Sequence, residues 1–254
     1  MSKLFERFIR PALFKLNAES AHDAGIAVLR LGLGSETAQR SASRKYRGRF
    51  PFAVERFGLK FDNPIGIAAG FDKNARVVNQ LASLGFGFVE VGTITLHPQP
   101  GNEKPRMFRL PEDEALINRL GFNNDGAKVV VERLSKLDRK CIVGVNIGKN
   151  KNVPNDEAVE NYLATFEYVH PAADYVAVNI SSPNTPNLRE LQRTENLDEL
   201  LGALQKRNLE LGLKPLLVKI APDLSDSEVE SIVIVCRKHK VAGMIATNTT
   251  ISRE

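Results

Sequence analysis

The chain has few of the residues that build disulfide scaffolds or metal centres: of 254 residues, two are cysteines, four are histidines and none is tryptophan. Cys141 and Cys236 are far apart, and each lies in an apolar run. This pattern predicts reduced core residues of a cytosolic protein and neither a disulfide nor a metal pair. No metal-ligand spacing occurs among the histidines, which are His22, His97, His170 and His239.

Long hydrophobic runs are also missing. No apolar run approaches the roughly 18 residues that span a bilayer, and no signal peptide is recognisable. The charge is mildly basic, with 35 Lys and Arg against 30 Asp and Glu. Without a block of basic residues, a nucleic-acid role gains little support, and we expect no nucleic-acid partner. An anionic small molecule and an anionic membrane surface suit this charge equally well.

Residues 1–40 differ from the rest of the chain. Apolar side chains recur there at helical spacing with basic residues between them: Leu4, Phe5, Phe8, Ile9, Leu13 and Phe14, with Lys3, Arg7, Arg10 and Lys15. We expect Pro11 to interrupt or kink this first helix. A second amphipathic helix is predicted over 18–31, with Gly32 or Gly34 as its cap. A basic, Phe-rich helix pair is either a packed N-terminal cap or an interfacial membrane anchor.

The pattern of residues 41–254 predicts an α/β domain. A polar, Arg-rich connection over 41–62 is predicted to end in a hairpin, with strands at 53–57 and 59–61 and a turn at Gly58. Six strands are then expected at 65–69, 88–91, 141–147, 175–180, 216–220 and 243–246, and helices at 75–84, 126–137, 156–169, 197–211 and 225–238. Repeated β–α units predict a parallel sheet, and the first strand lacks the Gly-rich turn of dinucleotide folds. We therefore predict a (β/α)8 TIM barrel, with about six of its eight strands present and an N-terminal two-helix extension.

The carboxyl end of every predicted strand is polar. These ends are residues 68–74, 91–93, 145–150, 179–184, 218–223 and 246–250. The stretch 178–186 alone could be a Ser/Pro/Asn turn that ends a strand. Barrel enzymes carry their chemistry at this end of the sheet, so the recurrence on all six strands predicts an active site.

The predicted site is rich in carboxamides and hydroxyls. Its members include Asn118, Asn146, Asn179, Asn184, Thr247, Asn248 and Thr249. A carboxamide complements the edge of a cyclic amide, an imide or a flavin. Lys219 lies in an apolar strand and needs an anionic partner, whereas Lys73 is either a second anion ligand or a solvated loop residue. One lysine could hold a substrate carboxylate and the other a cofactor ring, and Ser182 is a candidate proton acceptor.

These motifs, in this order, resemble the dihydroorotate dehydrogenase family, specifically its quinone-reducing class 2. The matching segments are 68–74, 108–113, 118–123, 145–150, 179–185 and 247–250. The resemblance implies an FMN-containing barrel of pyrimidine (UMP) biosynthesis that oxidises dihydroorotate to orotate and passes electrons to a membrane quinone. It also implies peripheral attachment to the cytoplasmic side of the cell membrane.

The resemblance implies roles for single residues. FMN contacts would be Ala68, Ala69, Gly70, Phe71, Asp72, Thr93, Asn146, Asn179, Lys219 and Thr247. Dihydroorotate contacts would be Lys73, Asn118, Arg119, Leu120, Gly121, Phe122, Asn179, Asn184, Asn248 and Thr249. Ser182 matches the base that takes a proton from substrate C5 while hydride passes from C6 to the flavin, and Thr185 and Phe122 would position the serine or its proton relay. Lys219 would stabilise negative charge on the flavin.

The N-terminal helix pair would form a quinone tunnel lined by His22 and Arg109. A soluble FMN barrel with another acceptor is the alternative, and it would carry a cysteine base and no helix pair. With about six of eight strands, the loops that normally bind the flavin phosphate lie beyond those predicted. We therefore expect the 254 residues alone to bind FMN weakly and fold marginally, and a non-catalytic remnant is a further alternative.

Overall fold

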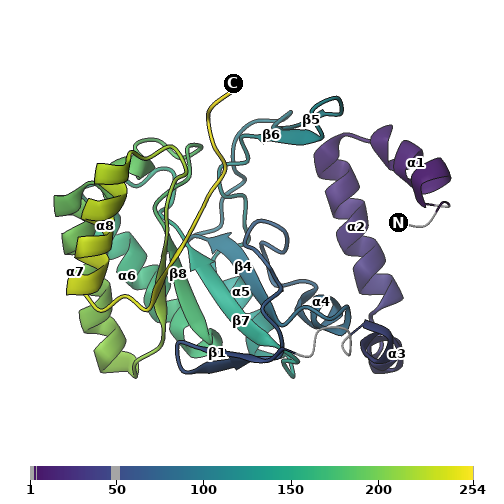
Figure 1. The fold of residues 1–254 in the computed structure, drawn as a ribbon, viewed down its shortest axis with the longest axis horizontal. Coiled ribbons are helices and arrows are strands. Elements are labelled where there is room, and N and C mark those ends of the chain that lie inside the picture. The colour runs from purple at the N-terminus through teal and green to yellow at the C-terminus, as the bar shows by residue number, and fades with distance from the viewer. Residues whose placement is uncertain (1–2, 4, 47–51, 254) are drawn as a thin grey trace.

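The core of the molecule is a six-stranded parallel sheet that curls into part of a barrel (Figure 1). The computed structural model describes residues 3, 5–46 and 52–253. The strand order is β10-β9-β8-β7-β4-β3, with β3 Gly66–Ile67, β4 Phe88–Ile94, β7 Ile142–Ile147, β8 Tyr175–Asn179, β9 Leu216–Lys219 and β10 Gly243–Ile245. Every neighbouring pair is parallel. All six predicted strands and the predicted α/β class are thus confirmed.

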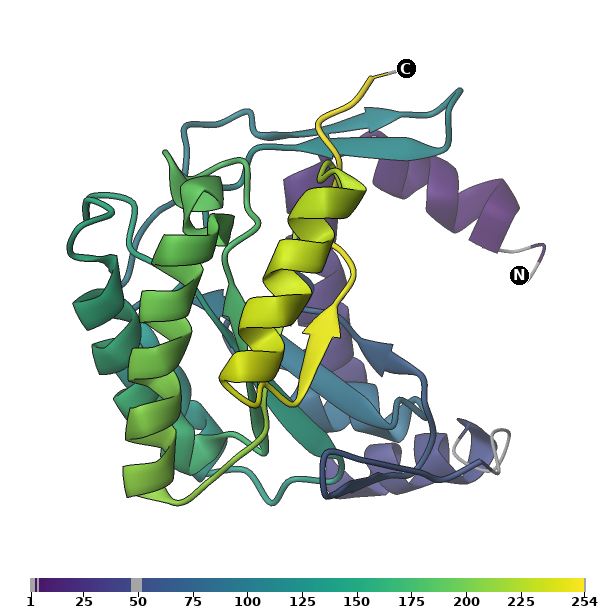
Figure 2. The ribbon, with the colours of Figure 1, turned by 60° about the vertical axis from the view of Figure 1, so that its left-hand side comes forward.

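Helices follow the strands and cover the convex face of the sheet, as Figure 2 shows for α6 to α8. They are α4 Val78–Ser83, α5 Ala127–Ser135, α6 Ala158–Val169, α7 Thr194–Leu211 and α8 Asp226–Lys238, with short 3-10 turns η3 His170–Ala172 and η4 Leu188–Gln192. The start of α8 is fixed by a capping box, in which Ser225 and Glu228 each accept a hydrogen bond from the other's backbone. The helices lie where the β–α pattern predicted them.

The N-terminal helices lie to one side of the sheet, beyond α4 (Figure 1). They are a π-helical turn η1 Phe5–Ile9, α1 Arg10–Phe14, α2 Ala18–Gly32 and α3 Glu36–Tyr46. Pro11 lies in the first turn of α1, where a missing N–H costs nothing, so it follows the π turn instead of breaking a helix. The predicted glycine cap of α2 is wrong, because Leu33 caps that helix through a hydrogen bond to the Leu29 carbonyl.

Two elements differ from the prediction. Helix α3 occupies part of the expected polar connection and crosses the expected boundary at residue 40; none of its residues is buried, so no apolar period marked it. An antiparallel hairpin, β5 Met107–Leu110 with β6 Ala115–Asn118, also was not predicted. The expected first hairpin is confirmed as β1 Val54–Arg56 with β2 Leu59–Phe61. Leu4 and residues 47–51, part of the connection, lie outside the described residues.

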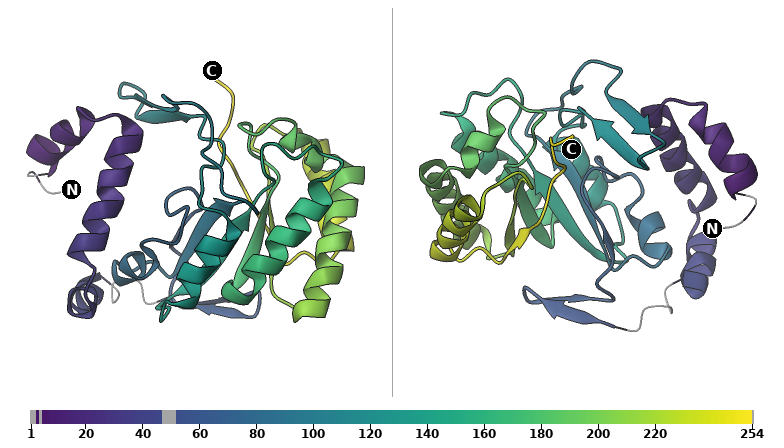
Figure 3. Two further views of the ribbon diagram at one scale, coloured as in Figure 1. Left: turned by 180° about the vertical axis from the view of Figure 1, so that it is seen from behind. Right: turned by 45° about the horizontal axis from the view of Figure 1, so that its top comes forward.

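The two hairpins lie at opposite ends of the sheet. The β1–β2 hairpin crosses the end where the strands begin, and the β5–β6 hairpin extends from the end where they finish, toward α2 (Figures 1 and 3). The carboxyl ends of the strands therefore lie at the same end of the sheet as the β5–β6 hairpin.

Candidate active site

A cavity of about 350 Å³ lies at the carboxyl ends of the strands. Its lining contains Ala69, Gly70, Lys73, Thr93, Met107, Asn118, Leu120, Gly121, Phe122, Asn179, Ser182, Asn184, Lys219, Thr247, Asn248 and Thr249. Apart from Met107, every one of these was a predicted site residue. Side chains from five strand ends and from the 118–122 loop thus surround one cavity, as expected at the carboxyl end of a barrel sheet.

Several predicted residues lie outside this lining. Ala68 lines an apolar cavity on the concave side of the sheet, together with Glu90 and Lys219. Arg119 is turned away, with its guanidinium donating to the Pro105 carbonyl. Asn146 lies behind Thr93, whose hydroxyl donates to the Asn146 Oδ1 at 2.6 Å.

Asp72 stabilises the loop between β3 and α4. Its two carboxylate oxygens accept hydrogen bonds from the backbone N–H groups of Arg76 and Val77, each at 2.8 Å. Burial raises the pKa of Asp72, and these backbone hydrogen bonds act in the opposite direction. The carboxylate accepts from the free backbone N–H groups before α4, so its local role is to hold Gly70 and Lys73 at the carboxyl end of β3.

Ser182 lies in the loop after β8 and is 5% exposed. Its Oγ accepts a hydrogen bond from the Asn184 N–H at 3.2 Å. Among the described residues, no histidine or carboxylate hydrogen-bonds to this hydroxyl, and the buried Thr185 Oγ1 has no hydrogen-bond partner. Thr185 does not line the cavity, and its hydroxyl is left to bond a neighbouring polar group.

Phe122 is held in an unusual backbone conformation beside the same cavity. Its φ is +53°, in the left-handed region that is rare for an aromatic residue. The ring lies against Gly148, where an added Cβ would come within 2.8 Å of Phe122 and 2.7 Å of Thr93. The absence of a side chain at Gly148 thus lets the Phe122 ring reach the end of β7.

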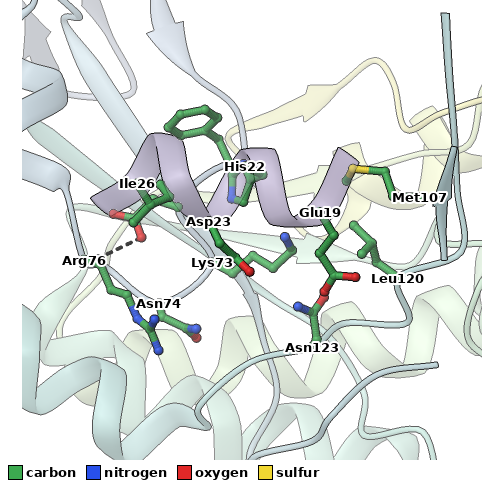
Figure 4. Close-up of a pocket in the computed structure, with 12 residues that line it drawn as sticks. Glu19, His22, Asp23, Ile26, Lys73, Asn74, Arg76, Met107, Leu120 and Asn123 are labelled. Atoms are coloured by element: carbon green, nitrogen blue, oxygen red, sulfur yellow. Dashed lines mark hydrogen bonds between the residues drawn. The ribbon is translucent and has the colours of Figure 1, made fainter. Parts of the chain in front are cut away.

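A second, smaller cavity of about 70 Å³ separates α2 from the 71–76 loop (Figure 4). His22 and Asp23 of α2 line it opposite Lys73, which also lines the main cavity. Burial and the nearby Lys73 ammonium lower the pKa of His22, so the imidazole is neutral near pH 7. The His22 and Phe71 rings meet edge to face, with centroids 5.2 Å apart.

Arg109 lies further out on the same side. Its guanidinium donates to the Leu16 carbonyl at 2.6 Å and lies 4.7 Å from the centre of the Phe14 ring. His22 lies on α2 and Arg109 contacts Leu16 and Phe14, but only His22 lines the small cavity, and the quinone tunnel stays a prediction.

An ion pair that was not predicted fastens α2 to the site. Arg106, 5% exposed, donates from Nε and Nη2 to the Glu19 carboxylate, the shortest distance being 2.6 Å. Its Nη1 donates to the carbonyls of Pro100 and Asn102. Hydrogen bonding from Arg106 lowers the pKa of Glu19 against an opposing effect of burial. The Arg106 carbonyl accepts from the Arg119 N–H, so this pair connects α2 to the 118–122 loop.

Glu19→Ala is expected to lower the free energy of unfolding by about 3 kcal/mol, because it leaves a buried guanidinium without its carboxylate. Urea unfolding measures this effect. Glu36→Ala is the control: it removes an exposed pair with Arg40 and should change stability by less than about 0.5 kcal/mol. Equal losses in the two variants would show that the Glu19–Arg106 pair does not anchor α2.

Comparisons with known proteins agree on one family. The family model for dihydroorotate dehydrogenase matches residues 52–254. A protein named dihydroorotate dehydrogenase (quinone) from Christiangramia forsetii is 51% identical over 99% of this chain and 74% of its own length. One of the same name from Chloroflexus aurantiacus is 51% identical over 99% of this chain and 72% of its own length.

Solved structures give the same result for the fold. The crystal structure of ligand-free DHODH from Eimeria tenella superposes with a TM-score of 0.83 at 40% identity, covering 94% of this chain and 70% of that one. The complex of the Eimeria tenella protein with ferulenol gives a TM-score of 0.81 at 39% identity, over 94% of this chain and 68% of that one.

Proposed function

Because the chain belongs to the dihydroorotate dehydrogenase family, we propose that it oxidises dihydroorotate to orotate in pyrimidine biosynthesis, with FMN as its flavin and a membrane quinone as electron acceptor. The observation that carries this proposal is the single cavity of about 350 Å³ around Ser182, Lys73 and Lys219. It combines one hydroxyl base, two cations and several carboxamides, and this set suits an anionic cyclic imide beside a flavin.

The residues present fit a flavin. Gly70 lines the cavity, and an added Cβ there would meet no atom within 4 Å, so the backbone is open to a flat ligand. Lys219, 8% exposed at the end of β9, supplies a cation, and Asn179 and Thr247 supply hydrogen-bonding groups. When bound, FMN would accept the hydride from the substrate and later release its electrons to quinone. The Lys219 ammonium would stabilise the negative charge that this transfer creates.

Dihydroorotate would lie over the same cavity. Its ring carries imide and amide groups that match the carboxamides of Asn118, Asn184 and Asn248. Lys73 would hold the substrate carboxylate, and Ser182 would take the proton from C5. Since an unaided hydroxyl is a weak base, the unpartnered Thr185 Oγ1 is the neighbour best able to accept a hydrogen bond in a path that carries the proton away.

The N-terminal helices would serve the quinone. Phe8 is 60% exposed, and Ile9, Phe14 and Leu16 are each 44% exposed. Among the described residues, no helix is both long and apolar enough to cross a membrane. The exposed apolar side chains suit peripheral attachment, in which α1 lies in the membrane surface and α2 faces the site.

We expect the affinity for orotate to fall as the pH rises through the pKa of Lys73. Burial lowers this pKa below its ordinary value, against the opposing effect of Glu19 and Asp23, and only the protonated ammonium binds the carboxylate. Lys73→Met should weaken orotate binding at neutral pH by about tenfold or more and remove the alkaline loss. Lys60→Met, on the exposed edge of the β1–β2 hairpin, is the control. An unchanged alkaline loss in Lys73→Met would contradict the assignment.

Steady-state turnover with dihydroorotate and a soluble quinone tests the whole proposal. The expected result is equimolar formation of orotate and quinol by FMN-loaded protein. Reduction of a nicotinamide or of fumarate in place of quinone would contradict the proposed electron acceptor. Absence of orotate would contradict the proposed reaction.

A further inference from the structure

A carboxylate is buried in the middle of the sheet, outside the cavity that Ser182 lines and beside the apolar cavity that Ala68 lines. Glu90, in β4, is 4% exposed and belongs to an otherwise apolar run from Phe88 to Val91. One of its oxygens accepts a hydrogen bond from Asn146 Nδ2 at 2.9 Å, and the other accepts one from the Tyr175 hydroxyl at 3.0 Å. A buried charge is costly, so its presence here needs a reason.

Glu90 lies at the end of a row of hydrogen-bonded side chains that reaches the cavity. We call Asn146, Thr93, Asn179, Ser181 and Asn248 the amide row. Asn248 Nδ2 donates to Ser181 Oγ at 3.0 Å, and Ser181 Oγ donates to Asn179 Oδ1 at 2.9 Å. Asn179 Nδ2 then donates to Thr93 Oγ1 at 2.9 Å, and Thr93 Oγ1 donates to Asn146 Oδ1 at 2.6 Å. Every donor in the row therefore points toward Glu90.

Backbone groups fix part of this direction: the Ser181 N–H donates to Asn179 Oδ1 at 3.2 Å, and the Thr249 N–H donates to Asn248 Oδ1 at 2.7 Å. Among the described residues, the side chains of Asn146 and Thr93 hydrogen-bond only to other side chains, and because a carboxamide and a hydroxyl both donate and accept, this pair needs another group to fix its direction. A carboxylate can only accept, and placing one at the end selects a single direction. Burial raises the pKa of Glu90, whereas Asn146, Lys219 and Tyr175 lower it. Both oxygens already accept a hydrogen bond, so this geometry satisfies the ionised form.

The orientation of Asn146 matters because its partner Thr93 lines the cavity. If Asn146 turned over, its amino group would face Thr93, and the Thr93 hydroxyl would have to find a new acceptor. Since Asn179 is held by the Ser181 N–H, the Thr93 hydrogen would turn toward the cavity and place a donor where an acceptor now lies.

We propose that Glu90 is a positioning residue that fixes the orientation of Asn146 and thereby sets which atom of the Thr93 hydroxyl faces the flavin and the substrate. The inference rests on the proposed function, because it takes a flavin and dihydroorotate as the ligands. It assigns to Glu90 the role of a hydrogen-bond acceptor, and it does not require its charge.

The test compares two replacements of Glu90. Glu90→Gln keeps an acceptor, since its Oε1 can face Asn146 while its Nε2 donates to the Tyr175 hydroxyl. Glu90→Met has similar volume and no such acceptor. The FMN dissociation constant, measured by fluorescence quenching on apoprotein, should rise less than about threefold for Gln and at least about tenfold for Met. Tyr175→Phe, which leaves the row intact, should stay within about threefold.

A second variant restores the direction without Glu90. In Glu90→Met/Asn146→Asp, a carboxylate at 146 accepts directly from Thr93, and we expect FMN binding at least about fivefold tighter than in Glu90→Met. The single Asn146→Asp variant places two carboxylates side by side and should bind worse than the parent. This opposite sign in the two backgrounds is a coupling that a merely structural role would not produce.

The outcomes separate this inference from the proposed function. Equal losses for Gln and Met would show that charge is what Glu90 supplies, and no loss in Met, or no rescue by Asn146→Asp, would likewise overturn the proposal. If the parent protein binds FMN and oxidises dihydroorotate, such results overturn only the role of Glu90. If the parent does neither, the proposed function itself fails.

Discussion

Ser182→Ala is expected to slow flavin reduction by dihydroorotate by about 10²- to 10⁴-fold while FMN stays bound. Ser182 is the hydroxyl that follows β8 in the cavity lining, whereas the flavin-facing groups come from several strands. Anaerobic stopped-flow mixing of the FMN-loaded protein with dihydroorotate measures the rate. An unchanged rate would remove Ser182 from the role of base.

Ser182→Cys is the matched control for that experiment. A thiol has an ordinary pKa near 8.5, so the fraction present as basic thiolate increases as the pH rises. This variant should therefore recover part of the lost rate in alkaline solution. Ser182→Ala has no group to ionise and should stay slow at every pH. If both variants respond to pH alike, the proton acceptor lies elsewhere in the site.

The second large effect is expected at the N-terminus. Replacing Phe8, Ile9 and Leu16 together by serine should lower partitioning onto anionic lipid vesicles by at least about a hundredfold, since each large apolar side chain contributes about 1.5–3 kcal/mol when it leaves water. Reduction of a membrane quinone should fall with it, because the quinone is delivered through the lipid. Flavin reduction by dihydroorotate should be unchanged, as the main cavity is not altered.

A control triple variant tests whether the position of the exposed apolar side chains matters, and not only their number. Leu209 and Leu213 are each 68% exposed and Ile234 is 62% exposed, on the α7 and α8 side of the molecule. Replacing these three by serine removes a similar apolar area and should leave vesicle binding within about twofold. Equal losses of flavin reduction and quinone reduction in the Phe8 triple variant would mean that the N-terminal helices are a structural cap.

The sheet could be predicted because its strands are continuous apolar runs with polar residues at one end. Strand β8, for example, is buried throughout, and Asn179 ends it at the cavity. Helix α3 could not be found in this way, because it buries no residue and leaves no apolar period. The β5–β6 hairpin likewise lacks the strict alternation of buried and exposed residues that marks a half-covered strand.

The site residues that lie at strand ends could be predicted, because each is marked by its neighbours in the sequence. Polar strand ends pointed to Lys73, Ser182 and the asparagines, which the structure gathers in one cavity. The Glu19–Arg106 pair joins residues 87 positions apart, and such a pairing has no local signature. Glu90 did leave a signal, a lone charge inside an apolar strand, and its meaning depends on partners from β7 and β8 that only the fold brings together.

Anaerobic titration of the FMN-loaded protein with dihydroorotate tests the central claim most directly. If the cavity at the strand ends holds flavin and substrate together, one equivalent of dihydroorotate bleaches the oxidised flavin absorbance and yields one equivalent of orotate. Adding quinone then restores the absorbance. A flavin that stays oxidised in excess dihydroorotate, or that is reduced equally fast in Ser182→Ala, would contradict the account.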